Sequence, residues 1–182
     1  FTSFDWKDFY KDAQEPIPID KPSPRGKSMS THCFVDANHA GDKTTRRSMT
    51  GILIFCNRAP IIWHSKHQNG VETSTFGSEF TALKNAVELI AALQYKLRMF
   101  GVPIDGPTDM FCDNEAVYKN ASTPESQLRK KHHSISYHMA REAVASEACC
   151  IAKEDTLTNL ADLFTKVLPK PRREYILNKF TY

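Results

Sequence analysis

Four carboxylates stand in four separate segments of the sequence, each at the end of an apolar run or within a helical pattern. They are Asp36, Glu79, Asp113 and Asp162. A lone carboxylate beside buried hydrophobic residues is costly, because the charge loses its water. If the four side chains meet, their mutual repulsion requires cations between them. Paired divalent ions held by carboxylates activate water for phosphoryl transfer. The four residues therefore predict a metal-dependent nuclease.

The segments that would position these carboxylates alternate between strand and helix patterns. Runs of β-branched and aromatic residues predict an antiparallel meander of strands at 32–36, 50–56 and 60–65. A helical pattern follows, from a cap at Ser74 or Thr75 to about Met99. The remaining predictions are strands at 108–113 and 148–153 and helices at 114–121, 129–147 and 157–167.

This order of elements predicts an α/β fold with a five-stranded mixed sheet flanked by helices. Three antiparallel strands come first, and two parallel strands follow, because a strand that comes after a long crossover helix runs parallel to an earlier one. The 182 residues suffice for one domain, expected at 31–170. Prolines predict that residues 1–30 form a linker or connection segment, and 171–182 a C-terminal tail. Because the chain begins at Phe1 rather than Met, we expect a piece of a longer protein.

Composition narrows the function classes only a little. A net charge of +3 is too small to establish a polyanionic partner, and a solvated surface explains the local basic clusters equally well. The five cysteines form no paired C-x-x-C motifs, so we expect buried free thiols in a reducing compartment and no structural zinc. No apolar run approaches the roughly 18 residues of a membrane span.

Five sequence motifs are each weak evidence of a family, but their occurrence together in one order is strong evidence. They are VDANHAGDKTTRRSMTG, IIWHSKHQNGVETSTFGSEFTAL, FCDNEAV, RKKHHSISYHMARE and NLADLFTKVLP. In residue types and spacing they resemble motifs of the ribonuclease H domains in copia-type LTR retrotransposon polyproteins, which also contain a reverse transcriptase. The motifs cover most of residues 32–170 in one order, which chance agreement does not explain.

The resemblance implies the ribonuclease H-like fold and a role for each carboxylate. Asp36 would bridge two Mg²⁺ ions, and Asp162 would complete the site of the ion that activates water. Glu79 and Asp113 would hold the other ion, beside the leaving 3′ oxygen. Hard oxygen ligands favour Mg²⁺, with Mn²⁺ as a substitute. Taken singly, each residue is equally well explained as a surface carboxylate or a helix cap.

The resemblance also implies contacts with nucleic acid. Ser74 and Thr75 could contact the backbone at the start of the long helix, and helix capping is a compatible alternative. Arg46 and Arg47 follow the first strand and could meet a substrate phosphate. Two further cationic candidates for gripping the DNA strand lie on the predicted 129–147 helix. These are Lys131 and His132.

Three other positions, Glu115, His138 and Trp63, are expected to have no catalytic role. Glu115 stands where the family commonly has Gln, which weakens the expected substrate contact there. His138 is expected in a structural polar cluster with Arg141 and Glu142, and Trp63 in the core.

The implied function is hydrolysis of the RNA strand of RNA–DNA hybrids during reverse transcription, leaving 5′-phosphate ends. The implied partners are the hybrid and the reverse transcriptase domain of the same polyprotein. No association with a membrane is expected. The expected location is the cytoplasm, in virus-like particles, or the nucleus. One alternative is a non-catalytic hybrid-binding or connection module that supports the reverse transcriptase. A second is an integrase or transposase core, although these usually carry three carboxylates in another element order.

Overall fold

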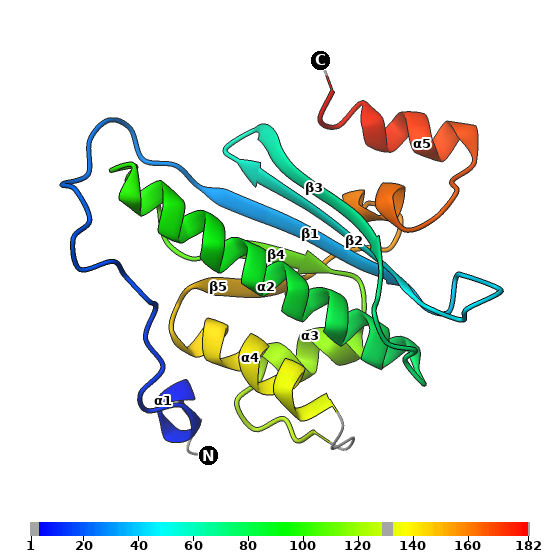
Figure 1. Ribbon diagram of the computed structural model, residues 1–182, viewed down its shortest axis with the longest axis horizontal. Coiled ribbons are helices and arrows are strands. Elements are labelled where there is room, and N and C mark those ends of the chain that lie inside the picture. The colour runs from blue at the N-terminus through cyan, green and yellow to red at the C-terminus, as the bar shows by residue number, and fades with distance from the viewer. Residues whose placement is uncertain (1–3, 129–132, 182) are drawn as a thin grey trace.

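The computed structural model describes residues 4–128 and 133–181, and a five-stranded sheet runs through its centre (Figure 1). The strands are β1 (Thr31–Asn38), β2 (Met49–Cys56), β3 (Ala59–His67), β4 (Thr108–Cys112) and β5 (Cys149–Lys153). Their order across the sheet is β3-β2-β1-β4-β5. The first three are antiparallel, and β4 and β5 run parallel to β1. The predicted mixed sheet is confirmed.

Three helices pack against one face of the sheet (Figure 1). They are α2 (Thr75–Met99), α3 (Glu115–Ser122) and α4 (Ser134–Ala145). Phe80, Leu83 and Ile90 of α2 repeat at helical spacing, so they share the face that meets Val35 and Ile52 of the sheet. This contact forms the main core and holds the N-terminal end of α2 in a fixed place relative to β1.

The other face of the sheet is covered in part by two elements near the C-terminus, η2 (Leu160–Phe164) and α5 (Lys170–Leu177). The alternation along β2 points Leu53 to this face, where it meets Leu160 and the fully buried Ile176. Because both faces are covered, β2 is buried along nearly its whole length.

Two sequence expectations differ from this arrangement. The helix predicted at 157–167 is a short 3₁₀ helix, η2, capped at its start by the Asn159 side chain. Most of the segment expected as a C-terminal tail forms α5, whose Ile176 anchors it in the second core.

Trp63 was expected in the core and is 67% exposed. It lies on β3, the edge strand, and faces outward beside α5 rather than beneath it. All five cysteines are free, but Cys150 is exposed. Adjacent strand residues point to opposite faces, so the vicinal pair in β5 cannot bury both thiols on the helix-covered side.

The N-terminal segment contains one short helix, α1 (Trp6–Phe9), and then runs without helix or strand to the start of β1 (Figure 1). Its aromatic residues anchor it: the Arg141 guanidinium lies 4.8 Å from the Trp6 ring, and Arg141 Nε donates to the Tyr10 hydroxyl at 3.1 Å. Tyr10 shares a further hydrogen bond of 2.8 Å with His138 Nδ1. The structural cluster predicted around His138 therefore includes the N-terminal segment.

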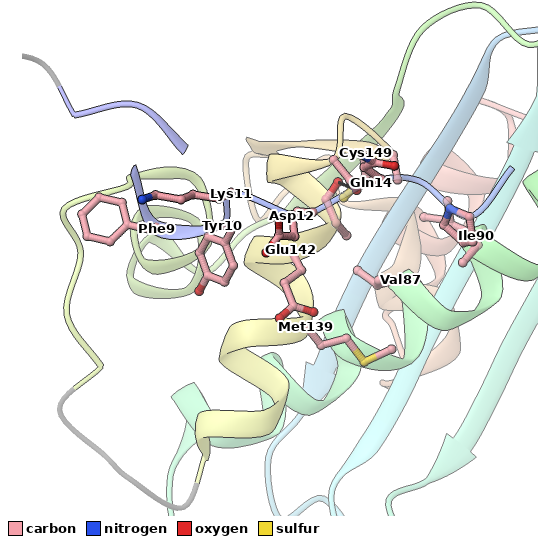
Figure 2. Close-up of a pocket in the computed structure, with 16 residues that line it drawn as sticks. Phe9, Tyr10, Lys11, Asp12, Gln14, Val87, Ile90, Met139, Glu142 and Cys149 are labelled. Carbon is pink, nitrogen blue, oxygen red and sulfur yellow. Dashed lines mark hydrogen bonds between the residues drawn. The ribbon is translucent and has the colours of Figure 1, made fainter. Parts of the chain in front are cut away.

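A cavity of about 630 Å³ lies where this segment passes over α2, α4 and β5 (Figure 2). Val87, Ile90 and Met139 form part of its apolar wall, and Glu142 lies at its polar side (Figure 2). None of the four predicted site carboxylates lines this cavity. Within the described parts of the chain, no helix combines the length and apolarity needed to span a bilayer.

Candidate metal and nucleic-acid site

Three of the predicted carboxylates come together at one edge of the sheet. Asp36 lies near the end of β1, and Asp113 directly follows β4, the adjacent parallel strand. Glu79 is in the second turn of α2, whose N-terminal end meets this edge. One carboxylate oxygen from each residue lies within 4.8 Å of the others. Two parallel strand ends and one helix start therefore form a compact acidic triad, Asp36/Glu79/Asp113.

Burial makes this triad electrostatically unusual. Asp36 and Glu79 are 1% and 6% exposed. Burial, and next the charges of Asp36 and Asp113, raise the pKa of Glu79 to about 9. Burial also raises the pKa of Asp36 to about 6, although Lys166 and Thr165 oppose this shift. The nearby side-chain cations do not fully neutralise these three carboxylates. Three close carboxylate oxygens of this kind are a ligand set suited to a hard divalent cation.

Asp162 is buried next to the triad but has different partners. It is 1% exposed, and Lys166 Nζ lies 2.8 Å from its Oδ1. Arg172 of α5 donates from Nη2 to the other carboxylate oxygen, Oδ2. The same Lys166 Nζ lies 3.2 Å from Asp36 Oδ2, which also accepts a hydrogen bond from the Thr165 hydroxyl. Asp162 is thus joined to Asp36 through the Lys166 ammonium.

The position of η2 beside β1 and β2 is what brings Asp162 here. The fully buried Asn159 donates from Nδ2 to the Val35 carbonyl at 3.0 Å and caps η2 through its Oδ1. Asn38 donates to the Thr165 carbonyl at 3.2 Å. A Cβ atom on Gly51 would lie 2.7 Å from the Ala161 carbonyl oxygen, so η2 packs directly on the β2 backbone.

Sequence reasoning missed several residues of this environment. They are Gly51, Asn159, Thr165, Lys166 and Arg172. Two of them carried a usable signal: Lys166 stands four residues after Asp162, and Asn159 occupies a cap position. Arg172 carried none, because its helix was not predicted.

The start of α2 is arranged as a capped helix terminus. The Ser74 hydroxyl accepts a hydrogen bond from the Gly77 backbone N–H at 3.2 Å, so the capping alternative holds for Ser74. Thr75 is exposed in the first turn. A Cβ atom on Gly77 would lie 2.4 Å from Cε1 of His133, so the absence of a side chain lets this imidazole pack against α2.

The other expected nucleic-acid contacts are distributed around the site. Arg46 and Arg47 are exposed in the β1–β2 loop, which follows Asp36 in the chain. Lys131 and His132 lie outside the described residues. Glu115 pairs with Lys119 at 2.6 Å and Lys153 at 3.1 Å, and hydrogen bonds from these two lysines lower its pKa to about 2. The carboxylate at this departure from the family pattern is therefore already neutralised by neighbouring cations.

Comparisons with known proteins agree with this arrangement. No protein-family model matches the chain. The retrovirus-related Pol polyprotein from transposon RE1 of Arabidopsis thaliana is 32% identical over 146 residues, which is 80% of this chain. The corresponding polyprotein from transposon TNT 1-94 of Nicotiana tabacum is 31% identical over 141 residues, or 78% of the chain. The chain is a homologue of copia-type transposon Pol polyproteins. It spans about 10% of the length of these relatives.

Among solved structures, LC11-RNase H1 in complex with an RNA/DNA hybrid aligns with a TM-score of 0.58 at 14% identity. The alignment covers 75% of this chain and 94% of LC11-RNase H1. This copia-type Pol homologue therefore has the ribonuclease H fold, as its motifs indicated.

Proposed function

We propose that this segment of a copia-type Pol polyprotein hydrolyses the RNA strand of RNA–DNA hybrids and leaves 5′-phosphate and 3′-hydroxyl ends. The observation that carries the proposal is the acidic triad, because the buried Asp36 and Glu79 and the half-buried Asp113 come from three separate segments and meet within 4.8 Å. A scaffold gains nothing from buried charges that repel one another. A divalent cation would relieve this repulsion while the carboxylates stay ionised.

The triad fits Mg²⁺, and Mn²⁺ as its substitute, because both prefer hard oxygen ligands. Asp36, Glu79 and Asp113 would hold the first ion of a two-ion site, and Asp36 and Asp162 would face the second. A bound divalent ion would supply stabilisation of the negative charge on the scissile phosphate and activation of water. The chain's own part is to fix these carboxylates on two strand ends, α2 and η2, and to exclude bulk water from Asp36 and Asp162.

The nucleic acid would lie across the start of α2 and the β1–β2 loop. The exposed Thr75 and the helix-terminal amides near Ser74 would meet backbone phosphate. Arg46 and Arg47 would add positive charge beside Asp36, and Lys131 and His132 remain candidates for the DNA strand. The solved LC11-RNase H1 complex supports this class of ligand by fold similarity. The similarity to Pol polyproteins supports a reverse transcriptase as the neighbouring domain. The proposed location is a virus-like particle in the cytoplasm, or the nucleus.

A gel assay with a hybrid labelled on the RNA strand tests the proposal. We expect Mg²⁺-dependent RNA fragments with 5′-phosphate ends, and no cleavage of duplex DNA. Asp113→Asn should reduce the rate at least about 100-fold, equivalent to about 2.7 kcal/mol. Asp109→Asn is a matched control, because Asp109 lies at the other end of β4 beside His32. No product from the wild-type chain, or full activity in Asp113→Asn, would refute the proposal.

One observation favours the second candidate, a non-catalytic hybrid-binding module. Both oxygens of Asp162 already have cationic side-chain partners, Lys166 and Arg172. This candidate predicts hybrid binding with no turnover at any Mg²⁺ or Mn²⁺ concentration, so the same assay, combined with a binding measurement, separates the two.

A further inference from the structure

The acidic site contains its own positive charges, and they are not evenly placed. Lys166 Nζ lies between Asp36 and Asp162, at 3.2 Å and 2.8 Å from their nearest oxygens. Arg172 Nη2 contacts the remaining oxygen of Asp162 and also donates to the Thr156 carbonyl. Glu79 and Asp113 have no such cationic partner among the ion pairs of residues 4–128 and 133–181. The two cations contact Asp36 and Asp162, and no ion pair of the described residues reaches Glu79 or Asp113.

Charge balance follows from these contacts. When all four carboxylates are ionised, the two side-chain cations leave two negative charges, which a single divalent ion neutralises. A second divalent ion would have to enter the Asp36–Asp162 side, where the Lys166 ammonium already lies within contact distance of both carboxylates. Two like charges cannot share that space without strong repulsion in a site this buried.

Local contacts hold the Lys166 ammonium between Asp36 and Asp162. It follows Asp162 by four residues, its backbone N–H donates to the Asp162 carbonyl at 3.1 Å, and its ammonium contacts the carboxylates of Asp36 and Asp162. A lysine side chain ordinarily loses its proton only above about pH 10, and the two carboxylates within 3.2 Å favour its charged form. The ammonium therefore remains charged at neutral pH.

We propose that Lys166 is a built-in cation of the metal site, so that the protein without nucleic acid binds one divalent ion, at Asp36, Glu79 and Asp113. The second ion enters only when a phosphate-bearing ligand adds negative charge and Lys166 withdraws from Asp36. This inference rests on the metal site of the proposed function, and it adds a positioning residue that controls how many ions the resting protein holds.

Counting bound Mn²⁺ by electron paramagnetic resonance tests the inference on the full 182-residue chain at pH 7.5, without nucleic acid. We expect the wild-type protein to bind one ion, with any second ion at least about tenfold weaker. Lys166→Met should bind two, because the vacated Asp36–Asp162 side becomes available, and the affinity for the second ion should rise at least about tenfold. Lys166→Arg keeps the positive charge and should bind one ion, as the wild type does.

Lys170→Met is the matched control. Lys170 is an exposed lysine of the neighbouring helix α5 that pairs only with Glu174, so its loss should leave the Mn²⁺ count at one. Thermal unfolding of each variant shows whether it is folded. If Lys166→Met does not fold, Lys166→Gln replaces it, because the amide still donates toward Asp162 without the charge.

Two results would overturn the inference: two ions of similar affinity on the wild-type protein, or a folded Lys166→Met or Lys166→Gln variant with the wild-type count. These results do not depend on catalysis. A protein that shows the expected Mn²⁺ counts but never cleaves hybrid would refute the proposed function and leave the role of Lys166 intact. Hybrid cleavage by the wild-type protein, together with an unchanged Mn²⁺ count in the Lys166 variants, would support the proposed function and refute the role of Lys166.

Discussion

Gly51 lies directly opposite Asp36 in the β1–β2 ladder, and its missing side chain is what lets η2 rest on the sheet. A Cβ atom at this position would lie 2.6 Å from Cγ2 of Thr165 and 2.7 Å from the Ala161 carbonyl oxygen. The contact is with backbone as well as side chain, so η2 could not accommodate a methyl group by a simple rotation. The residue that faces Asp36 across the ladder thus sets the position of Asp162.

Gly51→Ala should displace η2 and separate Asp162 and Lys166 from Asp36. We expect a loss of roughly 1–3 kcal/mol in the free energy of unfolding, the usual cost of overpacking. Hybrid cleavage should fall together with stability. Urea denaturation measures the first effect, and Gly70→Ala is the control, since a Cβ atom there meets nothing within 4 Å. Equal stability of the Gly51→Ala and wild-type proteins would show that η2 does not rest on β2 in this way.

The metal-free protein should lose stability as the pH rises. The pKa of Glu79 is about 9 in the folded protein and near 4.5 as a free side chain, so the folded state binds its proton more tightly. As the pH rises from about 4.5 to about 9, the free energy of unfolding should therefore decrease, by at most about 1.4 kcal/mol for each pH unit. Urea titrations in EDTA from pH 5.5 to 8.5 measure the slope. Glu79→Gln should flatten it, and a wild-type slope in that variant would exclude Glu79 as its cause.

Affinity for Mg²⁺ should show the opposite dependence on pH. A divalent ion competes with protons for Asp36 and Glu79, whose pKa values are raised to about 6 and about 9. Calorimetry should give binding at least about tenfold tighter at pH 8 than at pH 5.5, with release of protons at both. Equal affinity at the two pH values would mean that these carboxylates do not hold the ion.

Arg141 should be essential for joining the N-terminal segment to the domain. The residue is 2% exposed, and its guanidinium donates to the carbonyls of Asn120, Thr123 and Pro124 as well as to the Tyr10 hydroxyl. Lysine cannot reproduce this planar set of donors, so Arg141→Lys should cost about 2–4 kcal/mol of stability by leaving buried carbonyls without partners. Thermal unfolding would measure the loss.

The exposed Arg173 provides the control for this substitution, because Arg173→Lys should leave the unfolding temperature unchanged. Tyr10→Phe should have a smaller effect, about 1 kcal/mol, since it removes one hydroxyl shared by Arg141 and His138. Arg141→Lys with wild-type stability would contradict this account of the segment.

The sequence was sufficient to predict five strands, the first three antiparallel and the last two parallel, because strand and helix periodicity depend on local residue types. Asp36 near the end of β1 and Asp113 directly after β4 approach each other because these two parallel strands are neighbours, a pairing that the structure supplies. Glu79 required only that α2 begin near Ser74, which its cap confirms. The members of the acidic triad could therefore be named from single segments, but their meeting also requires that β4 lie beside β1.

Other parts of the site depend on contacts between distant segments, which no local pattern predicts. Arg172 reaches Asp162 from a helix whose few apolar residues include Ile176, too weak a period to predict. Gly51 looks like any strand glycine until η2 is placed over it. The prediction that Trp63 lies in the core was wrong for a related reason. The alternation of residues along β3 indicates which face of the sheet Trp63 is on, but only the strand order shows that β3 is an edge strand.

Diffraction from crystals soaked in Mn²⁺, recorded near the manganese absorption edge, is the most direct test of the central claim. We predict an anomalous peak within coordinating distance of oxygens from Asp36, Glu79 and Asp113 together, with Lys166 still in contact with Asp162. A peak bound elsewhere, or no peak at this edge of the sheet at saturating Mn²⁺, would contradict the account.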